Sequence, residues 1–239
     1  DTMKMVIYYK RGRGNYVSTN IATPELPEGY DEGYWDSITT TETTPSGNTL
    51  TYDVFRDIVD QSQTLSNSDY IFGESTVQMV YQNFKPTVSW LTGIWVKAGS
   101  TPVVGSPTGD IKVSIKKQGV DDILQYHTIE KELWTANAEI FVPFHLDLTV
   151  GSTYSILIGV TGSVSPTNYY KVAWRNSNVY ANGGMGTYQT GIGYRALNGG
   201  EADLWFKTTR GDVLLSNKRS PIDISSLPFI DRSEEHTSE

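Results

Sequence analysis

The sequence predicts an all-β protein: an antiparallel β-sandwich, or jelly roll, of about eight strands with an extended N-terminal segment. Two observations predict it. From Val77 onward, short runs of aromatic and β-branched residues recur, separated by clusters of Gly, Pro, Ser, Asn and Asp. Several runs also alternate apolar and polar residues, which is typical of a strand with one buried and one solvated face.

The stretch VGSPTGDIKVSIKKQG (104–119) shows both signals together. Its Gly, Pro and Asp residues before Ile111 supply turn chemistry, since Pro fixes φ and Gly permits positive φ. The alternation then places Ile111, Val113 and Ile115 on one face and the lysines on the other. This is a half-buried strand that follows a tight turn.

The other strands follow from the same patterns. Tyr154–Val160 is apolar at nearly every position, so we expect both of its faces to be covered. Pro143 lacks an N–H and favours an edge position for its strand. Residues 52–60 fit either a short helix or a lead-in strand. The expected strands are Val77–Phe84, Trp90–Lys97, Asp110–Lys117, Leu124–Leu133, Glu139–Leu148, Tyr154–Val160, Tyr169–Trp174 and Asp203–Thr208.

The domain organisation is expected to place the β-sandwich module at residues 71–211. Residues 12–70 form a linker or lead-in segment, with TTTETTPSGNT (39–49) its most linker-like part, and residues 212–231 form a C-terminal linker. Residues 5–27 and 203–228 share an order of features: strand, then Lys, Arg and Gly, then Leu-Pro. Residues 1–11 are therefore expected to be the last strand of a preceding module, with chance similarity and translation from Met3 or Met5 as alternatives.

Composition excludes several classes of function. The chain has no Cys, so disulfides, thiolate metal sites and Cys nucleophiles are excluded. Its net charge of −8 argues against general binding of nucleic acid, which needs a basic surface. No apolar run approaches the roughly 20 residues of a membrane span. We expect no cofactor, apart from a structural Ca²⁺ for which Asp69, Glu74 and Asp203 are conceivable ligands.

Catalytic patterns are weak, and the chain is expected not to be an enzyme. There is no G-x-S-x-G nucleophile motif and no H-E-x-x-H zinc motif. His127 and His145 are both expected to be solvated side chains. A glycosidase needs two carboxylates a few ångströms apart, which spacing in sequence does not reveal. The available carboxylates are Glu130, Glu132, Glu139, Glu201 and Asp203.

A carbohydrate site is predicted in the late part of the chain, over residues 174–195. Sugar rings expose C–H faces that pack on aromatic rings, and their hydroxyls bond to amides and Arg. GGMGTYQTGIGY (183–194) is expected to be a flexible loop, whose glycines let the backbone approach a ligand closely. Packing of the aromatic residues into the core or an interface is the alternative. The candidate residues are Trp174, Asn176, Tyr180, Tyr188, Tyr194 and Arg195.

Four stretches carry a resemblance to a known family: SPTGDIKVSIKK, FVPFHLDLTVGSTYSILIGV, NYYKVAWRNSNVYANGG and ADLWFKT. In order, they resemble jelly-roll, carbohydrate-binding-like (galactose-binding-like) modules of bacterial surface proteins and tailed-phage virion or tail proteins. The resemblance covers about Val77 to Thr209. The SPTGD corner, the L-x-x-G-x-x-Y pattern ending at Tyr154 and the D-L-x-F-K pattern starting at Asp203 are its most specific parts.

The resemblance implies a non-catalytic carbohydrate-binding or adhesion module of a larger extracellular or virion-associated protein. Its partner would be a cell-surface glycan or polysaccharide. The alternatives are a phage tail or capsid decoration domain that contacts other virion or surface-protein subunits, and an accessory or catalytic domain of a glycoside hydrolase. The last eight residues, RSEEHTSE (232–239), resemble a translated sequencing adapter, which implies a fragment from environmental DNA.

Overall fold

A computed structural model describes the backbone of residues 3–9, 15–17, 37–38, 50–120, 122–163, 165–189, 191–218 and 222–223, and side chains between residues 58 and 211. The chain divides into two compact units, Asp1–Asp57 with Gly211–Glu239, and Ile58–Arg210. The predicted linker at 39–49 and the predicted tail at 232–239 lie outside the described residues.

The first unit contains short antiparallel pairings. β1 (Met3–Tyr9) pairs with β2 (Asn15–Val17) and with the first part of β4 (Leu50–Gln63). β3 (Ser37–Ile38) pairs with β17 (Ile222–Asp223). Residues 52–60, for which the sequence fits a helix or a strand, therefore form a strand.

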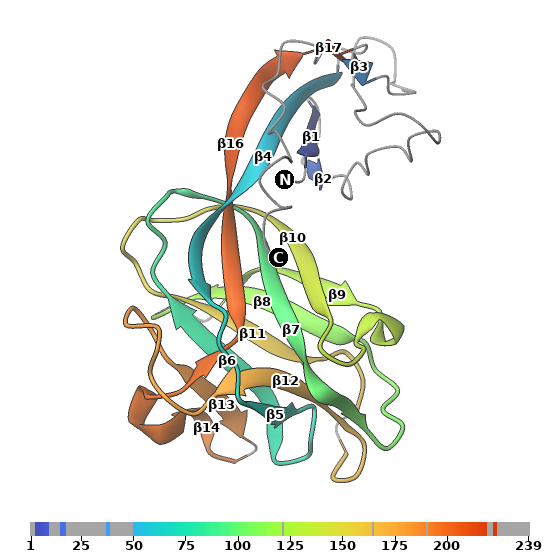
Figure 1. Ribbon diagram of the computed structural model, residues 1–239, viewed down its shortest axis with the longest axis vertical. Helices are drawn as coiled ribbons and strands as arrows, with labels where there is room; N and C mark the ends of the chain where they lie inside the picture. The colour runs from blue at the N-terminus through green and yellow to red at the C-terminus, as the bar shows by residue number, and fades with distance from the viewer. Residues whose placement is uncertain are drawn as a thin grey trace, which may run out of the picture. The chain divides into compact units, whose positions relative to one another are not determined.

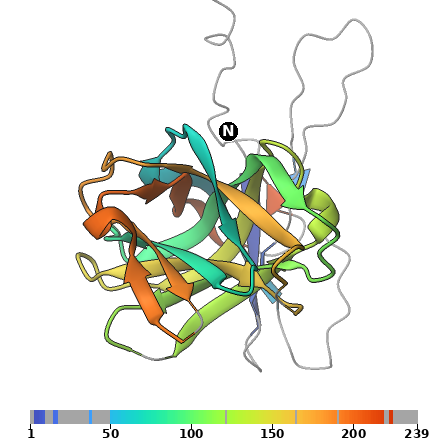
Figure 2. The same cartoon turned by 90° about the horizontal axis from the view of Figure 1, so that it is seen from below.

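The second unit is an antiparallel β-sandwich, which confirms the predicted fold class, whereas the jelly-roll assignment stays a prediction (Figures 1 and 2). One sheet has six strands in the order β14-β13-β6-β11-β8-β9, and the other contains β15, β12, β7 and β16, with β5 paired to β12 and β10 paired to β7. The strands are β5 (Ser68–Phe72), β6 (Val77–Phe84), β7 (Trp90–Val104), β8 (Ile111–Lys117), β9 (Ile123–Ile129), β10 (Glu139–Asp147), β11 (Tyr154–Val160), β12 (Tyr169–Arg175), β13 (Met185–Gln189), β14 (Gly193–Ala196), β15 (Asp203–Leu204) and β16 (Phe206–Lys218).

The core lies between the two sheets and is filled by the inward-facing residues of their strands. β11 lies between β6 and β8, and every residue from Tyr154 to Gly159 is buried, so the predicted coverage of both its faces is confirmed. Both sheets contribute fully buried side chains. Ile115 of β8 and Ile156 of β11 come from the six-stranded sheet, and Ile94 of β7 comes from the other. Burial of such side chains is the main favourable contribution to folding.

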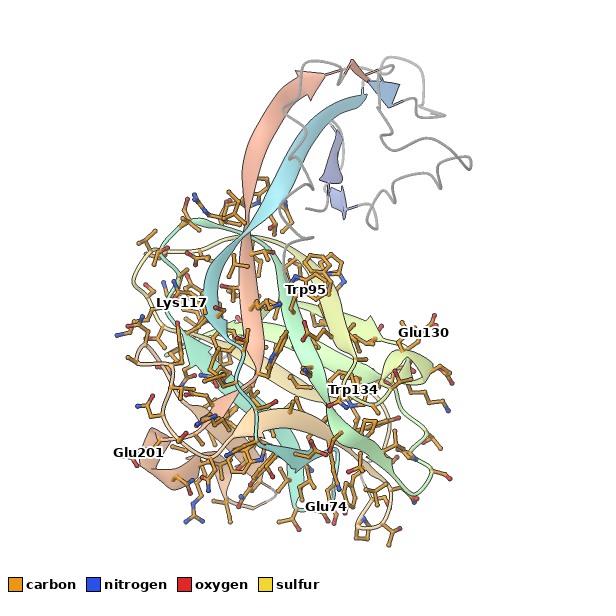
Figure 3. The ribbon with its side chains drawn as sticks, viewed as in Figure 1. Glu74, Trp95, Lys117, Glu130, Trp134 and Glu201 are labelled. Carbon is orange, nitrogen blue, oxygen red and sulfur yellow. The ribbon has the colours of Figure 1, made fainter. Side chains whose placement is uncertain are left out.

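Several strand boundaries differ from the sequence prediction. β9 ends at Ile129 and a 3-10 turn, η1 (Lys131–Leu133), follows, where a strand to Leu133 was expected. The turn brings Trp134 into the core, where its Nε1 donates to the Lys171 carbonyl at 3.0 Å (Figure 3). β7 extends to Val104 because its second half pairs with β12.

The segment expected as a single strand at 203–208 is divided at Trp205. β15 pairs with β12, whereas β16 pairs with β7, so the chain changes partner at this residue. The Trp205 N–H donates to the Ala173 carbonyl at 3.0 Å across the change. β10 pairs with β7 alone among the described strands, which is the edge position that Pro143 favours.

The glycine-rich stretch 183–194 is a β-hairpin rather than the expected flexible loop. β13 pairs with β14 on one side and with β6 on the other, so the hairpin extends the six-stranded sheet. A second short 3-10 helix, η2 (Leu197–Gly200), follows it. No helix in the described part of the chain has the length and apolar character that a bilayer span requires.

Candidate functional site

The candidate site lies on the outer face of the six-stranded sheet. In β6, Val80, Gln82 and Phe84 are buried, and the residues between them, Tyr81 and Asn83, are half-buried. Side chains of a strand alternate between the two faces of a sheet, so Tyr81 and Asn83 project away from the core. The register of the neighbouring strands carries the same face onto Ser155 and Leu157 of β11, Lys116 of β8, and Tyr188 and Tyr194 of the hairpin.

Three tyrosines form one cluster on this face. The Tyr188 and Tyr194 rings, opposite one another in the hairpin, have centroids 5.1 Å apart in an edge-to-face arrangement. Tyr81 meets Tyr194 edge-to-face at 5.7 Å. Burial, and then the neighbouring Tyr194, raise the pKa of Tyr81. Tyr194 is 51% exposed, so an aromatic surface held by two other rings faces solvent.

Gly186 of β13 explains how Tyr81 can lie against the sheet. A Cβ at this position would stand 2.2 Å from the Tyr81 hydroxyl oxygen and 2.4 Å from the Arg195 carbonyl oxygen. Both distances are far below van der Waals contact. A side chain other than hydrogen at residue 186 would therefore displace the Tyr81 ring or separate β13 from β14.

A shallow pocket of roughly 180 Å³ opens beside the tyrosine cluster. Leu157 contributes an apolar wall that is only 2% exposed and is not part of the core between the sheets. Ser155 Oγ donates to Asn83 Oδ1 at 2.7 Å, which orients the Asn83 amide. Lys117 lies on the opposite side of the view from Glu130 (Figure 3). The lining residues are Tyr81, Asn83, Lys116, Lys117, Gln118, Gly119, Ser155, Leu157 and Tyr194.

Lysines of β8 lie over tyrosine rings on this sheet. Lys116 Nζ is 5.3 Å from the centroid of Tyr194, and Lys112 Nζ is 4.1 Å from that of Tyr126. Such cation–π contacts hold ammonium groups against the sheet surface. The face therefore combines aromatic rings, amides, a hydroxyl and positive charge, which together suit a polyhydroxylated ligand.

The structure brings together two of the six residues predicted for carbohydrate binding, Tyr188 and Tyr194. Arg195 is exposed beside them on β14, and adjacent residues of a strand project to opposite faces. Trp174 belongs to β12 of the other sheet and packs edge-to-face on Tyr70 at 5.0 Å. The Trp174 Nε1 atom is buried and has no hydrogen-bond partner among the described residues.

The remaining two predicted residues lie apart from the pocket lining. Asn176 is exposed after β12, where its N–H donates to Asn67 Oδ1 at 3.4 Å and its Oδ1 accepts from Asn198 Nδ2. Tyr180 is 6% exposed, and its hydroxyl donates to Gln61 Oε1 at 3.0 Å. Burial is the main cause that raises the pKa of Tyr180 to about 12. Its ring belongs to the core.

Sequence reasoning missed several pocket residues, notably Tyr81, Asn83, Lys116 and Lys117. The sequence does contain a pattern that predicts the outward position of two of these residues. Alternation in Val77–Phe84 places Tyr81 outside, and alternation in Ile111–Lys117 places Lys116 outside. What the pattern does not reveal is that β11 lies between these strands.

The two histidines, predicted to be solvated side chains, are half-buried. His145 Nδ1 accepts from Trp90 Nε1 at 3.3 Å, and the His145 N–H donates to Gln125 Oε1 at 3.3 Å. His127 Nε2 bonds to Gln125 Nε2 at 2.8 Å, and burial lowers the pKa of His127. The bond between the His145 N–H and Gln125 connects β10 with β9.

The three conceivable calcium ligands each accept hydrogen bonds from the protein. Asp69 bonds to Ser100 and Thr101; burial alone would raise its pKa, but these bonds outweigh burial and lower it. Glu74 accepts from the Thr76 and Val77 amides. Asp203 is fully buried and accepts three bonds. The described residues contain no group of three acidic or histidine side chains placed to hold a metal ion.

Of the carboxylates considered for a glycosidase, Glu130 and Glu132 lie together at η1, and Asp203 is buried in β15. Glu139 lies 3.4 Å from the Nζ atoms of both Lys97 and Lys207. Glu130 and Glu201 are exposed on opposite sides of the view in Figure 3. A retaining or inverting pair needs carboxylates within about 10 Å of one another.

Comparison of the chain with family models, with curated proteins and with solved structures gave no match.

Proposed function

We propose that this protein is a non-catalytic carbohydrate-binding or adhesion module, and that a glycan binds on the outer face of the six-stranded sheet beside Tyr194. One observation carries the proposal. Tyr194 is 51% exposed, yet its ring is held edge-to-face by both Tyr81 and Tyr188 next to a pocket with amide and hydroxyl groups. A fixed aromatic platform with adjacent hydrogen-bonding groups supports recognition of a sugar ring.

Tyr194 is accessible to a ligand, whereas the aromatic residues that face the core are not. Tyr180, in the same part of the sequence, is buried and bonded to Gln61. Tyr194 presents its ring to solvent while Asn83, Ser155 and Gln118 line the space beside it. Directional hydrogen bonds from such groups would orient the sugar on the ring.

The experiment compares two exposed tyrosines of the same sheet. Tyr126 on β9 is 56% exposed and is not among the pocket-lining residues, so Tyr126→Ala is a matched control for Tyr194→Ala. We expect affinity electrophoresis in gels containing polysaccharides to show retention of the unaltered protein and of Tyr126→Ala. Tyr194→Ala should lose most of that retention, and Tyr188→Ala a part of it.

Two results would contradict this site. Equal loss in Tyr194→Ala and Tyr126→Ala would indicate a general surface effect. Retention lost only in Trp174→Ala would place the glycan on the other sheet, where Trp174 packs on Tyr70. Thermal unfolding of each variant ensures that loss of retention is compared between folded proteins.

A second candidate function, a tail or capsid decoration domain acting through protein contacts, is favoured by a different observation. Ile123 and Leu124, at the start of the edge strand β9, are 42% and 41% exposed, and Val120 is 40% exposed in the turn before them. Exposed apolar residues beside an unpaired strand edge are typical of a contact with another chain. Sedimentation of the full chain, with and without Ile123→Ser and Leu124→Ser, tests this candidate through the loss of self-association.

A further inference from the structure

We infer that the ligand of this pocket is an acidic glycan, one whose sugar residues bear carboxylate groups. The inference rests on the proposed function and adds the charge of the ligand to it. It follows from the difference between the charge of the pocket and the charge of the chain, from the excess of donors at the pocket, and from the position of Lys116 beside the Tyr194 ring.

The charge of the pocket lining is opposite in sign to that of the chain. The chain has 27 acidic and 19 basic residues, a net charge of −8. The residues that line the pocket include Lys116 and Lys117 and no Asp or Glu. Asp122, the described acidic residue of the following turn, is exposed and is not part of the lining. A positive site on an acidic protein favours an anion locally while the rest of the surface repels it.

The strand sequence explains why the lysines gather here. In IKVSIKK (111–117), the outward positions of β8 are Lys112, Ser114 and Lys116, and Lys117 ends the strand. Lys117 Nζ is 5.9 Å from the centroid of Tyr154, and Lys117 lines the pocket on the β8 side. Lys116 faces outward, and its Nζ, 5.3 Å from the centroid of Tyr194, is the ammonium group within reach of a carboxylate above Leu157.

The uncharged groups of the pocket also favour an acceptor. Ser155 Oγ uses its proton on Asn83 Oδ1, and the Asn83 amide nitrogen carries two N–H donors at the pocket. Gln118 is exposed at the rim and offers a second amide. Carboxylate oxygens only accept hydrogen bonds, so ammonium and amide N–H groups match them.

The experiment uses one polysaccharide in two forms, with the full chain in each case. Oligomers of polygalacturonate carry a carboxylate on every residue, and their carboxyl-reduced form has the same linkages without charge. Binding of both is measured by calorimetry at 50 mM and 500 mM NaCl. Lys116→Gln removes the pocket charge beside Tyr194, and Lys131→Gln removes an equal charge from η1, where Lys131 pairs with Glu132.

The expected result is tighter binding of the charged oligomer at 50 mM salt by about tenfold, with the difference reduced at 500 mM because salt screens exposed charges. Lys116→Gln should weaken binding of the charged oligomer by about twofold to fivefold and leave the neutral form unchanged. Lys131→Gln should change neither. Lys117→Gln gives a second test of the same pocket.

Other outcomes overturn the inference and separate it from the proposed function. Equal affinity for the two forms, with Tyr194→Ala weakening both, would refute the acidic ligand and leave the carbohydrate-binding function standing. Equal weakening by Lys116→Gln and Lys131→Gln would attribute the effect to net charge and would also refute the inference. Binding of neither form to the unaltered protein, with no retention on any glycan, would refute the inference and the proposed function together.

Discussion

Gln82 and Asp203 join the two sheets through a buried hydrogen bond, in which Gln82 Nε2 donates to Asp203 Oδ1 at 3.1 Å. Both side chains are fully buried, and they lie 121 positions apart in the chain. Gln82 Oε1 also accepts from the Leu204 N–H at 2.8 Å. Asp203 Oδ2 accepts from the Val179 and Tyr180 N–H groups at 2.8 and 2.9 Å. One polar pair therefore fixes β6, β15 and the segment that leads into the β13–β14 hairpin.

Replacing Asp203 with Asn should destabilise the protein. Both carboxylate oxygens accept N–H donors, so the amide NH₂ group would face a donor in either orientation. An unsatisfied buried group costs about 1–3 kcal/mol, so the free energy of unfolding in urea should fall by that amount. Asp122→Asn, at an exposed position, is the control and should change it little. Equal stability of the two variants would show that the network does not stabilise the sandwich.

Tyr180 should make the protein sensitive to alkali. Its pKa is about 12 in the folded state, above the ordinary value of 10.0, because the ring is buried. Folding therefore favours the neutral phenol. The stability that this preference contributes is fully present below pH 10 and is lost as the pH rises toward 12. Over that range the unaltered protein should lose on the order of 2 kcal/mol more stability than Tyr180→Phe does. Parallel pH dependences of the two proteins would contradict the burial of this hydroxyl.

His127 should make the stability of the protein sensitive to acid. Burial lowers the pKa of His127 below 6.5, so the unfolded chain takes up the proton more readily than the folded chain. The contribution of the neutral His127 side chain to stability should therefore be fully present above pH 6.5. It should decrease as the pH falls through the pKa of His127 in the folded protein. His127→Gln should remove that part of the acid dependence, measured as thermal midpoints between pH 8 and pH 5. An unaltered acid dependence in the variant would assign it to other groups.

Gly186→Ala should destabilise the hairpin and disturb Tyr81. The added Cβ would overlap both the Tyr81 ring and the Arg195 carbonyl oxygen. Overpacking of this kind costs about 1–3 kcal/mol. In a Tyr81→Ala background the cost should be smaller, because one of the two overlaps is gone. A double-mutant cycle measures this difference, and strictly additive effects would show that the Tyr81 ring does not lie over Gly186.

The alternation of apolar and polar residues predicted most strands of the sandwich, and it did so best where a strand has two distinct faces. Val77–Phe84 was predicted with the bounds that the structure has. The pattern failed at η1, where the chain must turn to bury Trp134, because a distant partner at Lys171 decides that turn. It also missed the β13–β14 hairpin, because the local preference of glycine for loops is overridden by pairing with β6.

The site was predictable only in part for the same reason. Tyr180 and Tyr194 are both tyrosines near glycines, and the sequence around them does not distinguish them. Gln61 and Lys85 enclose the hydroxyl of Tyr180, whereas Tyr194 lies on the last strand of the six-stranded sheet. The pocket combines residues from β6, β8, β11 and β14. Their adjacency depends on the strand order of the sheet, which alternation within single strands does not reveal.

Backbone amide chemical shifts, followed while an acidic oligosaccharide is added to the full chain, test the location of the site most directly. We expect shifts at Lys116–Gly119, at Tyr81 and at Gly193–Arg195, with Tyr126 and the residues around Trp174 unchanged. Shifts centred on Trp174 and Asn176, with Tyr194 unaffected, would contradict a binding face on the six-stranded sheet.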